Sequence, residues 1–311
     1  MTSVPRLARL KDRSPRAVRD VANHVTRTYG VASAHWRPYP DFLIVGTKRG
    51  GTTSLWNYLL DHDQVLPMFP APRLRKSSDY FFVNLHRSDR WYRSHFHTVP
   101  YRRRRADEVG TVVTGEASPY YMYGPHIPAH IARIMPQVRL IVLLRDPVNR
   151  AYGHYQERVK EGTEDLSFSA ALEAEPQRLA VDEQRRQNDP TYYSRAHDLF
   201  SYRDRGIYLP QLQRLAEHFP ADQLLVVRSE DLYTDPQTVY DDVARFLGIR
   251  PRPLRDARQH NYIPRSPIDP EVAATLRAFY QPHNRRLFEY LGRDLGWPKS
   301  SSPSRCDDCG G

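Results

Sequence analysis

The chain has 311 residues, of which 40% are hydrophobic and 26% charged, as in an ordinary globular protein of one large or two small domains. No apolar run approaches the roughly 20 residues that a membrane-spanning helix needs, and two cysteines are too few for a disulfide framework. The 46 Lys and Arg residues outnumber the 36 Asp and Glu residues, and the resulting formal charge of +10 favours an anionic ligand.

Residues 1–39 form a basic N-terminal arm that lacks the apolar core of a secretory signal. Two interpretations of this arm stay open, a peripheral contact with an anionic membrane and a solvated helix. A second basic run, residues 102–105, is interpreted as a solvated loop, with a grip on a polyanion as the alternative. No nucleic-acid-binding motif accompanies either run, so we expect no nucleic-acid partner.

Apolar, β-rich runs alternate with helical patterns along the rest of the chain. The predicted strands are 42–45, 111–114, 140–144 and 224–227, and the predicted helices are 52–62, 127–134, 149–161, 209–218, 237–247 and 270–291. This alternation predicts an α/β fold in three layers, with a mostly parallel central sheet flanked by helices. The polar stretch 173–195 is interpreted either as a mobile lid or as an ordinary insertion.

The last residues, 299–311, have the composition of a disordered tail. Cys306 and Cys309 in this tail supply half of a zinc site, and no second Cys or His pair lies nearby in the sequence to complete it. The lack of disulfides is compatible with a reducing cytoplasm, which is the location we expect.

The first predicted strand runs directly into a basic, glycine-rich loop and then into a helix, which is the layout of a phosphate-binding loop. The glycines allow tight turns, and the loop amides with the helix N-terminus form a nest for anionic oxygens. Two cations and two hydroxyls complete this site, whose residues are Gly46, Lys48, Arg49, Gly50, Gly51, Thr52 and Thr53. Thr52 stands at the lysine position of the Walker A motif, so the loop differs from that of nucleotide triphosphatases.

A second candidate site begins where the buried strand "LIVLL" ends at Arg145. Asp146 and Pro147 form a turn, and the following helix carries His154. Ligands of open α/β sheets bind at the carboxyl ends of the strands, and the guanidinium fork of Arg145 suits a phosphate. A structural role in pairing with a carboxylate is the alternative for Arg145.

Together the two sites resemble those of the sulfotransferases that use 3′-phosphoadenosine-5′-phosphosulfate (PAPS). The loop resembles the family's 5′-phosphosulfate loop, and the stretch from Arg145 resembles its 3′-phosphate motif. "KSSDYFF" (76–82) is similar to the K-E-x-x-Y-F segment of the carbohydrate-type and related bacterial branch, and "GEASPYY" (115–121) to its G-E-x-S-P-x-Y segment. The resemblance covers residues 40–298, which we expect to be a P-loop-containing sulfotransferase domain.

Three residues depart from the family pattern. Many relatives have lysine where this chain has Arg49, although Lys48 lies alongside. Gly153 replaces a serine that contacts the 3′-phosphate, and Ser77 replaces the glutamate that acts as the base. Asp79 is the nearest carboxylate to Ser77 in the sequence and is our candidate for the base.

The resemblance implies transfer of a sulfuryl group from PAPS, without a metal, to a hydroxyl or amine of an acceptor. The acceptor would be a carbohydrate, a glycolipid or another small metabolite. The implied catalytic residues are Arg49, Lys48 and Asp79, with His154 as a second candidate base. The implied donor-binding residues are Lys48, Arg49, Gly50, Gly51, Thr52, Thr53, Arg145 and Gly153. The aromatic side chains of "DYFF" and "SPYYMY" are expected to form part of the acceptor pocket, with Phe81 and Tyr120 in the core.

Two other functions stay open. A P-loop kinase or NTPase is disfavoured by Thr52 at the Walker lysine position and by the absence of an evident metal-binding carboxylate in the sequence. A non-catalytic protein that binds a nucleotide or polyanion is compatible with the changes at positions 49, 77 and 153.

Overall fold

A parallel sheet lies at the centre of the computed structural model, which describes residues 16–70, 75–260 and 267–298. The strand order is β2-β3-β1-β4-β5, and every neighbouring pair is parallel. The strands are β1 (Phe42–Gly46), β2 (Val65–Leu66), β3 (Val113–Ala117), β4 (Arg139–Leu144) and β5 (Leu224–Arg228). The predicted α/β class with a mostly parallel sheet is therefore confirmed.

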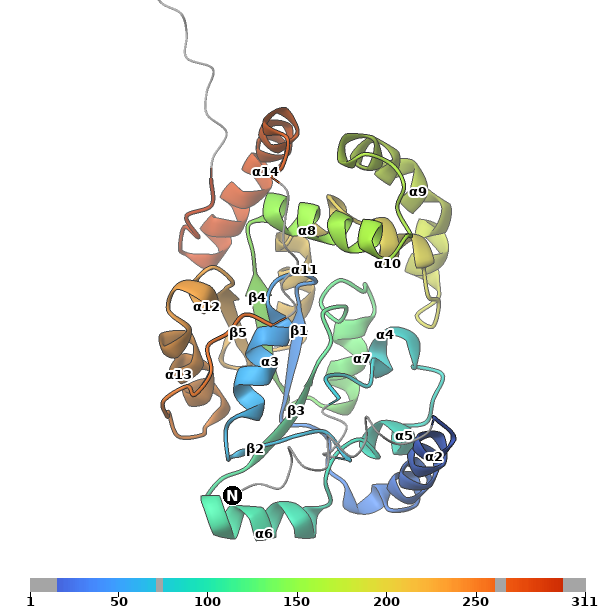
Figure 1. Cartoon of the computed structure of the whole chain (residues 1–311), viewed down its shortest axis with the longest axis vertical. Coiled ribbons are helices and arrows are strands. Elements are labelled where there is room, and N and C mark those ends of the chain that lie inside the picture. The colour runs from blue at the N-terminus through green and yellow to red at the C-terminus, as the bar shows by residue number, and fades with distance from the viewer. Residues whose placement is uncertain (1–15, 71–74, 261–266, 299–311) are drawn as a thin grey trace, which may run out of the picture.

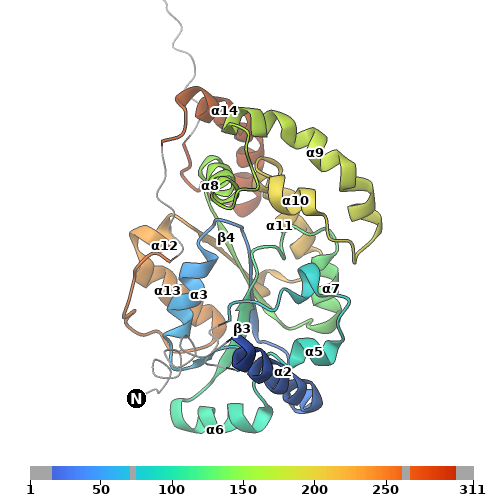
Figure 2. The ribbon, with the colours of Figure 1, turned by 45° about the vertical axis from the view of Figure 1, so that its right-hand side comes forward.

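Helices cover both faces of the sheet, as Figures 1 and 2 show: α3 and α13 lie on one side, and α7 and α11 on the other. Helices α8, α9, α10 and α14 lie beyond the end of the sheet at which β1 and β4 finish (Figure 1). The helices are α2 (Arg16–Ala32), α3 (Thr52–Leu60), α4 (Tyr80–Val83), α5 (Asp89–Arg93), α6 (Val99–Val109), α7 (Ile127–Ile134), α8 (Pro147–Lys160), α9 (Phe168–Asn188), α10 (Arg195–Phe200), α11 (Leu209–Ala216), α12 (Asp231–Thr234), α13 (Pro236–Leu247) and α14 (Pro270–Leu291).

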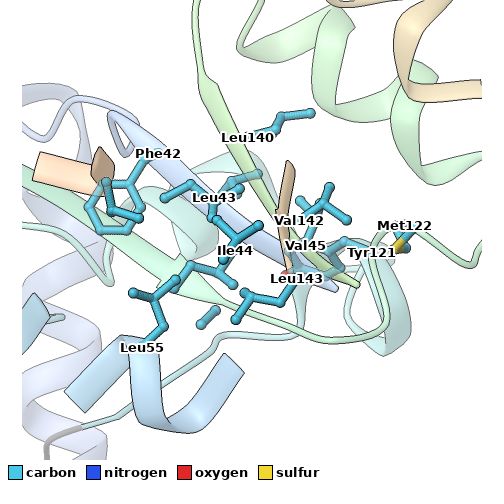
Figure 3. Close-up of a cluster of buried hydrophobic side chains, with 14 of the residues drawn as sticks. Phe42, Leu43, Ile44, Val45, Leu55, Tyr121, Met122, Leu140, Val142 and Leu143 are labelled. Carbon is cyan, nitrogen blue, oxygen red and sulfur yellow. The ribbon is translucent and has the colours of Figure 1, made fainter. Parts of the chain in front are cut away.

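The core is built around the two central strands, β1 and β4. All five residues of β1 are buried, and so are the last five of β4, because helices cover both faces of these strands. Figure 3 shows Leu43 and Ile44 of β1 beside Leu140 and Val142 of β4, with Leu55 of α3 packed below them. This rigid pair of strands positions the loops that follow them.

Several boundaries and the loop predicted for the arginine run were wrong. The predicted strand 111–114 is β3, which begins and ends a few residues later, and β2 was missed because two residues leave little sequence signal. The arginine run 102–105 lies within helix α6 rather than in a loop, and Arg102 forms an ion pair with Asp41. Most of the polar stretch 173–195 belongs to α9, which begins at Phe168 with Ser167 as its N-cap.

The arm 1–39 is described only from residue 16, where α2 begins. Arg27 of α2 donates a hydrogen bond of 2.7 Å to the Ser94 hydroxyl, next to α5. The predicted tail 299–311, with Cys306 and Cys309, lies outside the described residues. The domain boundaries, the membrane contact and the cytoplasmic location stay predictions. In the part of the chain that is described, no helix has the length and apolarity that would let it span a membrane.

Candidate active site

The loop between β1 and α3 is held by β4 on one side and by Ser229 on another. The Thr47 amide donates to the Leu143 carbonyl oxygen of β4 at 2.9 Å, and the Ser229 hydroxyl donates to the Gly50 carbonyl oxygen at 2.6 Å. Gly51 has a φ of 93°, which favours glycine, and a Cβ atom on Gly50 would lie 2.9 Å from the Leu143 carbonyl oxygen. The loop conformation thus requires glycine at these two positions, as the sequence predicted.

Arg145 lies where the sequence predicted, directly after β4, and its side chain reaches back to the loop. Its Nη1 atom donates to the carbonyl oxygen of Arg49 at 3.0 Å, while Tyr208 donates from its hydroxyl to the Arg145 carbonyl oxygen at 2.8 Å. Arg49 itself has a φ of 68°, a conformation that residues other than glycine rarely adopt and that is frequent at functional sites. The two predicted anion-binding segments are therefore one structural unit.

A cavity, here called the anion cavity, opens between the loop, α8 and the segment that begins at Lys76. The described residues that line it are Lys48, Arg49, Gly51, Thr52, Thr53, Lys76, Pro119, Tyr120, Arg145, Glu157, Tyr233, Gln259 and His260. Four of these residues are cations and one is a carboxylate, so the lining has an excess of positive charge. Thr52 and Thr53 begin α3, where the first amides of a helix have no intrahelical acceptor. Such a cavity suits a ligand with several negative charges.

Two cations of the loop share the one carboxylate. Arg49 Nη1 lies 3.3 Å from Glu157 Oε1, and Lys48 Nζ lies 3.8 Å from Glu157 Oε2. Burial and, to a smaller extent, the neighbouring Arg205 guanidinium lower the pKa of Lys48 to about 8, although Asp198 and Glu157 oppose this shift. Arg49 Nε is buried without a hydrogen-bond partner among the described residues, so it has a donor to spare for a ligand.

Lys76 is a further cation of the cavity. It was not among the site residues predicted from the sequence. Its Nζ atom donates to the hydroxyls of Thr52 at 2.9 Å and Thr53 at 3.0 Å. Burial lowers the pKa of Lys76 to about 8, against the opposing influence of Asp79 and Glu157. Lys76 stands at the lysine position of the K-E-x-x-Y-F segment, and this match was the signal in the sequence that could have identified it.

A buried glutamate holds the segment that carries Lys76. Glu116 of β3 is fully buried and accepts hydrogen bonds from both the amide and the hydroxyl of Ser78, each at 2.7 Å. It also accepts from the hydroxyls of Tyr121 at 2.9 Å and Tyr92 at 3.2 Å. Burial raises the pKa of Glu116, and the hydrogen bonds from Ser78 and Tyr121 oppose this shift. In the sequence this glutamate was recognisable only as part of the G-E-x-S-P-x-Y segment.

The remaining predicted site residues lie away from the described lining of the anion cavity. Asp79 accepts hydrogen bonds of 2.8 Å from the hydroxyls of Ser77 and Ser118. Gly153 is buried on α8. His154 is fully buried, and its ring packs against Tyr202. Burial holds the pKa of His154 well below the ordinary value, so its contacts are those of a packed core residue. The catalytic role of Asp79 and the donor contact of Gly153 stay predictions.

A second cavity, here called the aromatic cavity, adjoins the first. Tyr120 lines both cavities and is only partly buried, so its predicted place in the core was wrong, whereas Phe81 is buried and its predicted place in the core is confirmed. The Tyr120 ring stacks on Phe82 with ring centroids 4.1 Å apart, and Tyr193 packs edge-on against Phe82 at 5.4 Å. Tyr193 is not part of the described lining, which contains, besides Phe82 and Tyr120, the side chains of Phe81, Tyr123, Tyr192, Arg186, Asp189, Asp198, Arg205, His126 and His197.

Asp198 of α10 connects the two cavities. Its Oδ1 atom lies 3.3 Å from Lys48 Nζ, and its Oδ2 atom accepts a hydrogen bond of 2.7 Å from the Tyr193 hydroxyl. Glu157 and Asp198 were both missed from the sequence. Glu157 lies on the same face of α8 as Arg150 and His154, and this helical spacing could have predicted that it lies near them. Nothing near Asp198 in the sequence indicated its role.

Among the residues that the structure describes, no group of three or more His, Cys, Asp and Glu side chains is arranged to hold a metal ion.

Comparison with known proteins identifies the family. The family model of the sulfotransferase domain matches residues 39–265. The chain is 29% identical over 289 residues to the human bifunctional heparan sulfate N-deacetylase/N-sulfotransferase 3, a match that covers 84% of this chain and 31% of that protein. It is 27% identical over 289 residues to the mouse heparan sulfate glucosamine 3-O-sulfotransferase 3B1, which covers 83% of this chain and 65% of that protein.

The chain thus spans less than two thirds of the length of these two relatives. A solved structure, the sulfotransferase from Alicyclobacillus acidocaldarius, aligns with a TM-score of 0.60 and 26% identity over 83% of this chain and 97% of that one. Since the family model covers well over half of the sequence, this chain belongs to the sulfotransferase domain family.

Proposed function

We propose that this chain transfers a sulfuryl group from PAPS to a hydroxyl or amine of a carbohydrate or other small-molecule acceptor. The observation that carries the proposal is the anion cavity near the ends of β1 and β4, whose described lining holds four cations and one carboxylate. The heparan sulfate sulfotransferases among the relatives support a carbohydrate acceptor. The low cysteine count supports a reducing, cytoplasmic setting.

The residues present fit the donor, which supplies the sulfuryl group and leaves as adenosine 3′,5′-bisphosphate. Lys48, Arg49 and Lys76 would hold the 5′-phosphosulfate, together with the amides and hydroxyls of Thr52 and Thr53. Arg145 would hold the 3′-phosphate. Two features of this chain match such an anion: the excess positive charge of the cavity, and the Arg49 Nε atom, which has no hydrogen-bond partner among the described residues.

Positioning and electrostatic stabilisation are the main contributions of the protein to this reaction. The cations are preorganised by contacts inside the protein, because Glu157 orients Lys48 and Arg49 while the two threonine hydroxyls orient Lys76. They therefore need little rearrangement when negative charge develops on the leaving phosphate.

The direct test is incubation of the purified chain with ³⁵S-labelled PAPS and a panel of carbohydrate, lipid and phenolic acceptors. Transfer of label to an acceptor is expected, and it should persist in EDTA, since the cavity lysines and arginines neutralise the donor. Loss of transfer in EDTA with recovery in Mg²⁺ would contradict the metal-free reaction. ATP turnover with Mg²⁺ in place of sulfuryl transfer would favour a P-loop kinase or NTPase.

A second candidate is a protein that binds the donor without transferring the sulfuryl group. Ser77 at the position of the family's glutamate favours this candidate, because it removes the usual base. Binding of adenosine 3′,5′-bisphosphate without transfer to any acceptor in the panel would support it.

Arg145→Ala is expected to weaken binding of adenosine 3′,5′-bisphosphate by about 1.5–3 kcal/mol, the range for hydrogen bonds to charged groups. Isothermal titration calorimetry measures this change. Arg145→Lys is the matched control, because lysine keeps the positive charge but lacks the planar guanidinium fork. This variant should bind adenosine 3′,5′-bisphosphate with intermediate affinity. Unchanged affinity in Arg145→Ala would remove Arg145 from the site.

Binding of the same product is expected to weaken as the pH rises above about 8. Lys48 and Lys76 both have a pKa of about 8 in the free protein, so each is protonated at lower pH and loses its charge at higher pH. Above this pH, binding of an anion that contacts a protonated lysine requires the lysine to take up a proton. The affinity for the anion then falls by up to about tenfold per pH unit for each such lysine. Calorimetry between pH 7 and 9.5 measures the slope.

Lys48→Arg and Lys76→Arg are the controls for this pH dependence, because a guanidinium stays charged throughout the range. Each variant should show a shallower slope than the wild type. A flat profile for the wild type would mean that neither ammonium contacts the anion.

A further inference from the structure

We propose that the aromatic cavity binds the acceptor as an uncharged ring that carries a hydroxyl group, and that Asp198 receives the proton of that hydroxyl. This inference rests on the proposed function and defines the acceptor side of the same site.

The aromatic cavity lies where an acceptor would meet the bound donor. Tyr120 lines both cavities, and Lys48 Nζ lies 5.2 Å from the centre of the Tyr120 ring. Lys48 also donates to the Asp198 carboxylate at 3.3 Å. An acceptor against Tyr120 therefore has the loop lysine and the Asp198 carboxylate beside it.

The walls of the cavity suit a ring. Phe82 and Tyr120 both line the cavity and stack on each other, and Tyr193, outside the described lining, packs edge-on behind Phe82. Flat apolar faces bind aromatic rings and the apolar faces of sugars alike, and the tyrosine hydroxyls can form hydrogen bonds at the rim.

The arginines of the cavity already have partners within the protein. Arg186 pairs with Glu183 at 3.2 Å, and Arg205 donates to the His197 carbonyl oxygen at 2.8 Å. Together with Asp189 and Asp198, these two arginines leave the described lining without a net charge. A polyanionic acceptor would have to approach Asp198 without a matching excess of cations in the cavity.

Exposed arginines do occur further out, on the helices that frame the cavity. Arg185 of α9 lies over the Tyr192 ring at 4.2 Å, and Arg195 begins α10. A sulfated polysaccharide is therefore the competing acceptor, and the experiment includes it.

Asp198 is better placed to take the proton than the two other carboxylates near the site. Asp79 is held by the hydroxyls of Ser77 and Ser118 and is not part of the described lining of either cavity. Glu157 lies in the anion cavity against Arg49, on the donor side. Only Asp198 among the three lines the aromatic cavity and contacts the donor loop.

The groups that face Asp198 keep it ionised and therefore able to accept a proton. They are the Lys48 ammonium from the loop, the Tyr193 hydroxyl before α10 and the Arg205 guanidinium that follows this helix. Burial alone would raise the pKa of Asp198, but these three groups outweigh burial and lower that pKa.

In the proposed step the acceptor oxygen forms a bond to sulfur while the bond between sulfur and the bridging oxygen of PAPS breaks. The electron pair of the broken bond leaves with the phosphate, and the proton of the acceptor hydroxyl passes to the Asp198 carboxylate. The products are a sulfate ester, adenosine 3′,5′-bisphosphate and one proton, which Asp198 later releases to water.

The experiment measures kcat/KM for wild type, Asp198→Asn and Asp79→Asn against phenols whose pKa values range from below 7 to about 10. A positioned base contributes about 10²–10⁴-fold to a proton transfer, so Asp198→Asn should lose that factor with the weakly acidic phenols. It should lose little with phenols whose pKa lies at least one unit below the assay pH, because these are largely ionised and have no proton to give up. For the wild type, kcat/KM should depend only weakly on the pKa of the acceptor, and Asp79→Asn should show the same weak dependence.

Two controls separate catalysis from structure. Asp182→Asn removes a carboxylate that accepts a hydrogen bond from Ser194, the N-cap of α10, and should leave the dependence on acceptor pKa unchanged. Binding of adenosine 3′,5′-bisphosphate to each variant reports whether Lys48 and the loop keep their positions. An equal loss in Asp198→Asn for all phenols would overturn the assignment of Asp198, and a selective loss in Asp79→Asn would transfer the role to Asp79.

The acceptor class is tested with the wild type on phenols, uncharged aryl and alkyl glycosides, and heparan sulfate oligosaccharides. Phenols and glycosides share the hydroxylated ring, and their relative kcat/KM values show which of the two the cavity prefers. A higher kcat/KM for the sulfated oligosaccharide would overturn the proposed acceptor class. Absence of transfer to every acceptor would contradict the proposed function itself, which keeps the two failures distinguishable.

Discussion

Replacing Arg49 by alanine is expected to lower turnover by about 10²–10³-fold, the typical cost of losing a preorganised group that stabilises transition-state charge. Arg49 lines the anion cavity at the position where many relatives have lysine. Its backbone has the left-handed conformation, and hydrogen bonds from Arg145 and Ser229 hold the loop that carries it. Its fixed charge acts most strongly on the leaving phosphate, where negative charge develops. Binding of adenosine 3′,5′-bisphosphate, measured separately by calorimetry, should weaken far less than turnover.

Arg49→Lys and Lys48→Ala are the companion variants. The lysine restores the residue of many relatives and should keep substantial activity, although it cannot reproduce a bidentate contact. Lys48 is 4% exposed and faces Glu157, Asp198 and the Tyr120 ring. It therefore does not point to solvent, and Lys48→Ala should also reduce turnover, but less than Arg49→Ala. A nearly normal Arg49→Ala beside an inactive Lys48→Ala would reverse the assignment of the two cations.

Glu116→Ala is expected to lower the free energy of unfolding by about 4 kcal/mol or more, since each buried donor that loses its acceptor costs about 1–3 kcal/mol. Four donor groups lose their acceptor together: the amide and hydroxyl of Ser78 and the hydroxyls of Tyr92 and Tyr121. The Ala117 amide, one residue further along β3, donates to the Lys76 carbonyl oxygen, so the same region also holds a cation of the anion cavity. Urea unfolding at fixed pH measures the change.

Tyr92→Phe and Ser78→Ala are the matched controls, because each removes a single hydroxyl while the carboxylate keeps its other donors. Each should cost about 0.5–3 kcal/mol, the range for one hydrogen bond, with bonds to a charged group at the upper end. A loss below 1 kcal/mol in Glu116→Ala would show that water or local rearrangement satisfies the four donors.

Predictions from the sequence succeeded where local order carries the information. Continuous apolar runs predicted β1 and β4 because strands buried on both faces need no polar face. The apolar run 224–227 likewise predicted β5, an edge strand that is only partly buried. The phosphate-binding loop and Arg145 were also identified, since strand, glycines, cations and helix follow one another within a few residues. The short strand β2 and the arginine-rich helix α6 were missed, as neither has an apolar period long enough to detect.

The contacts that convert the loop into a site come from distant parts of the chain. Lys48 and Asp198 are 150 residues apart in the sequence, and Arg49 and Glu157 are 108 apart. No periodicity or spacing relates such residues, because the sheet and the helices beyond its carboxyl end bring them together only on folding. The sequence by itself therefore determined the fold class, the anion-binding loop and the family resemblance. Only the tertiary structure decided which carboxylates face the cations and that Lys76 completes the cavity, because these contacts depend on how separate elements pack at the ends of β1 and β4.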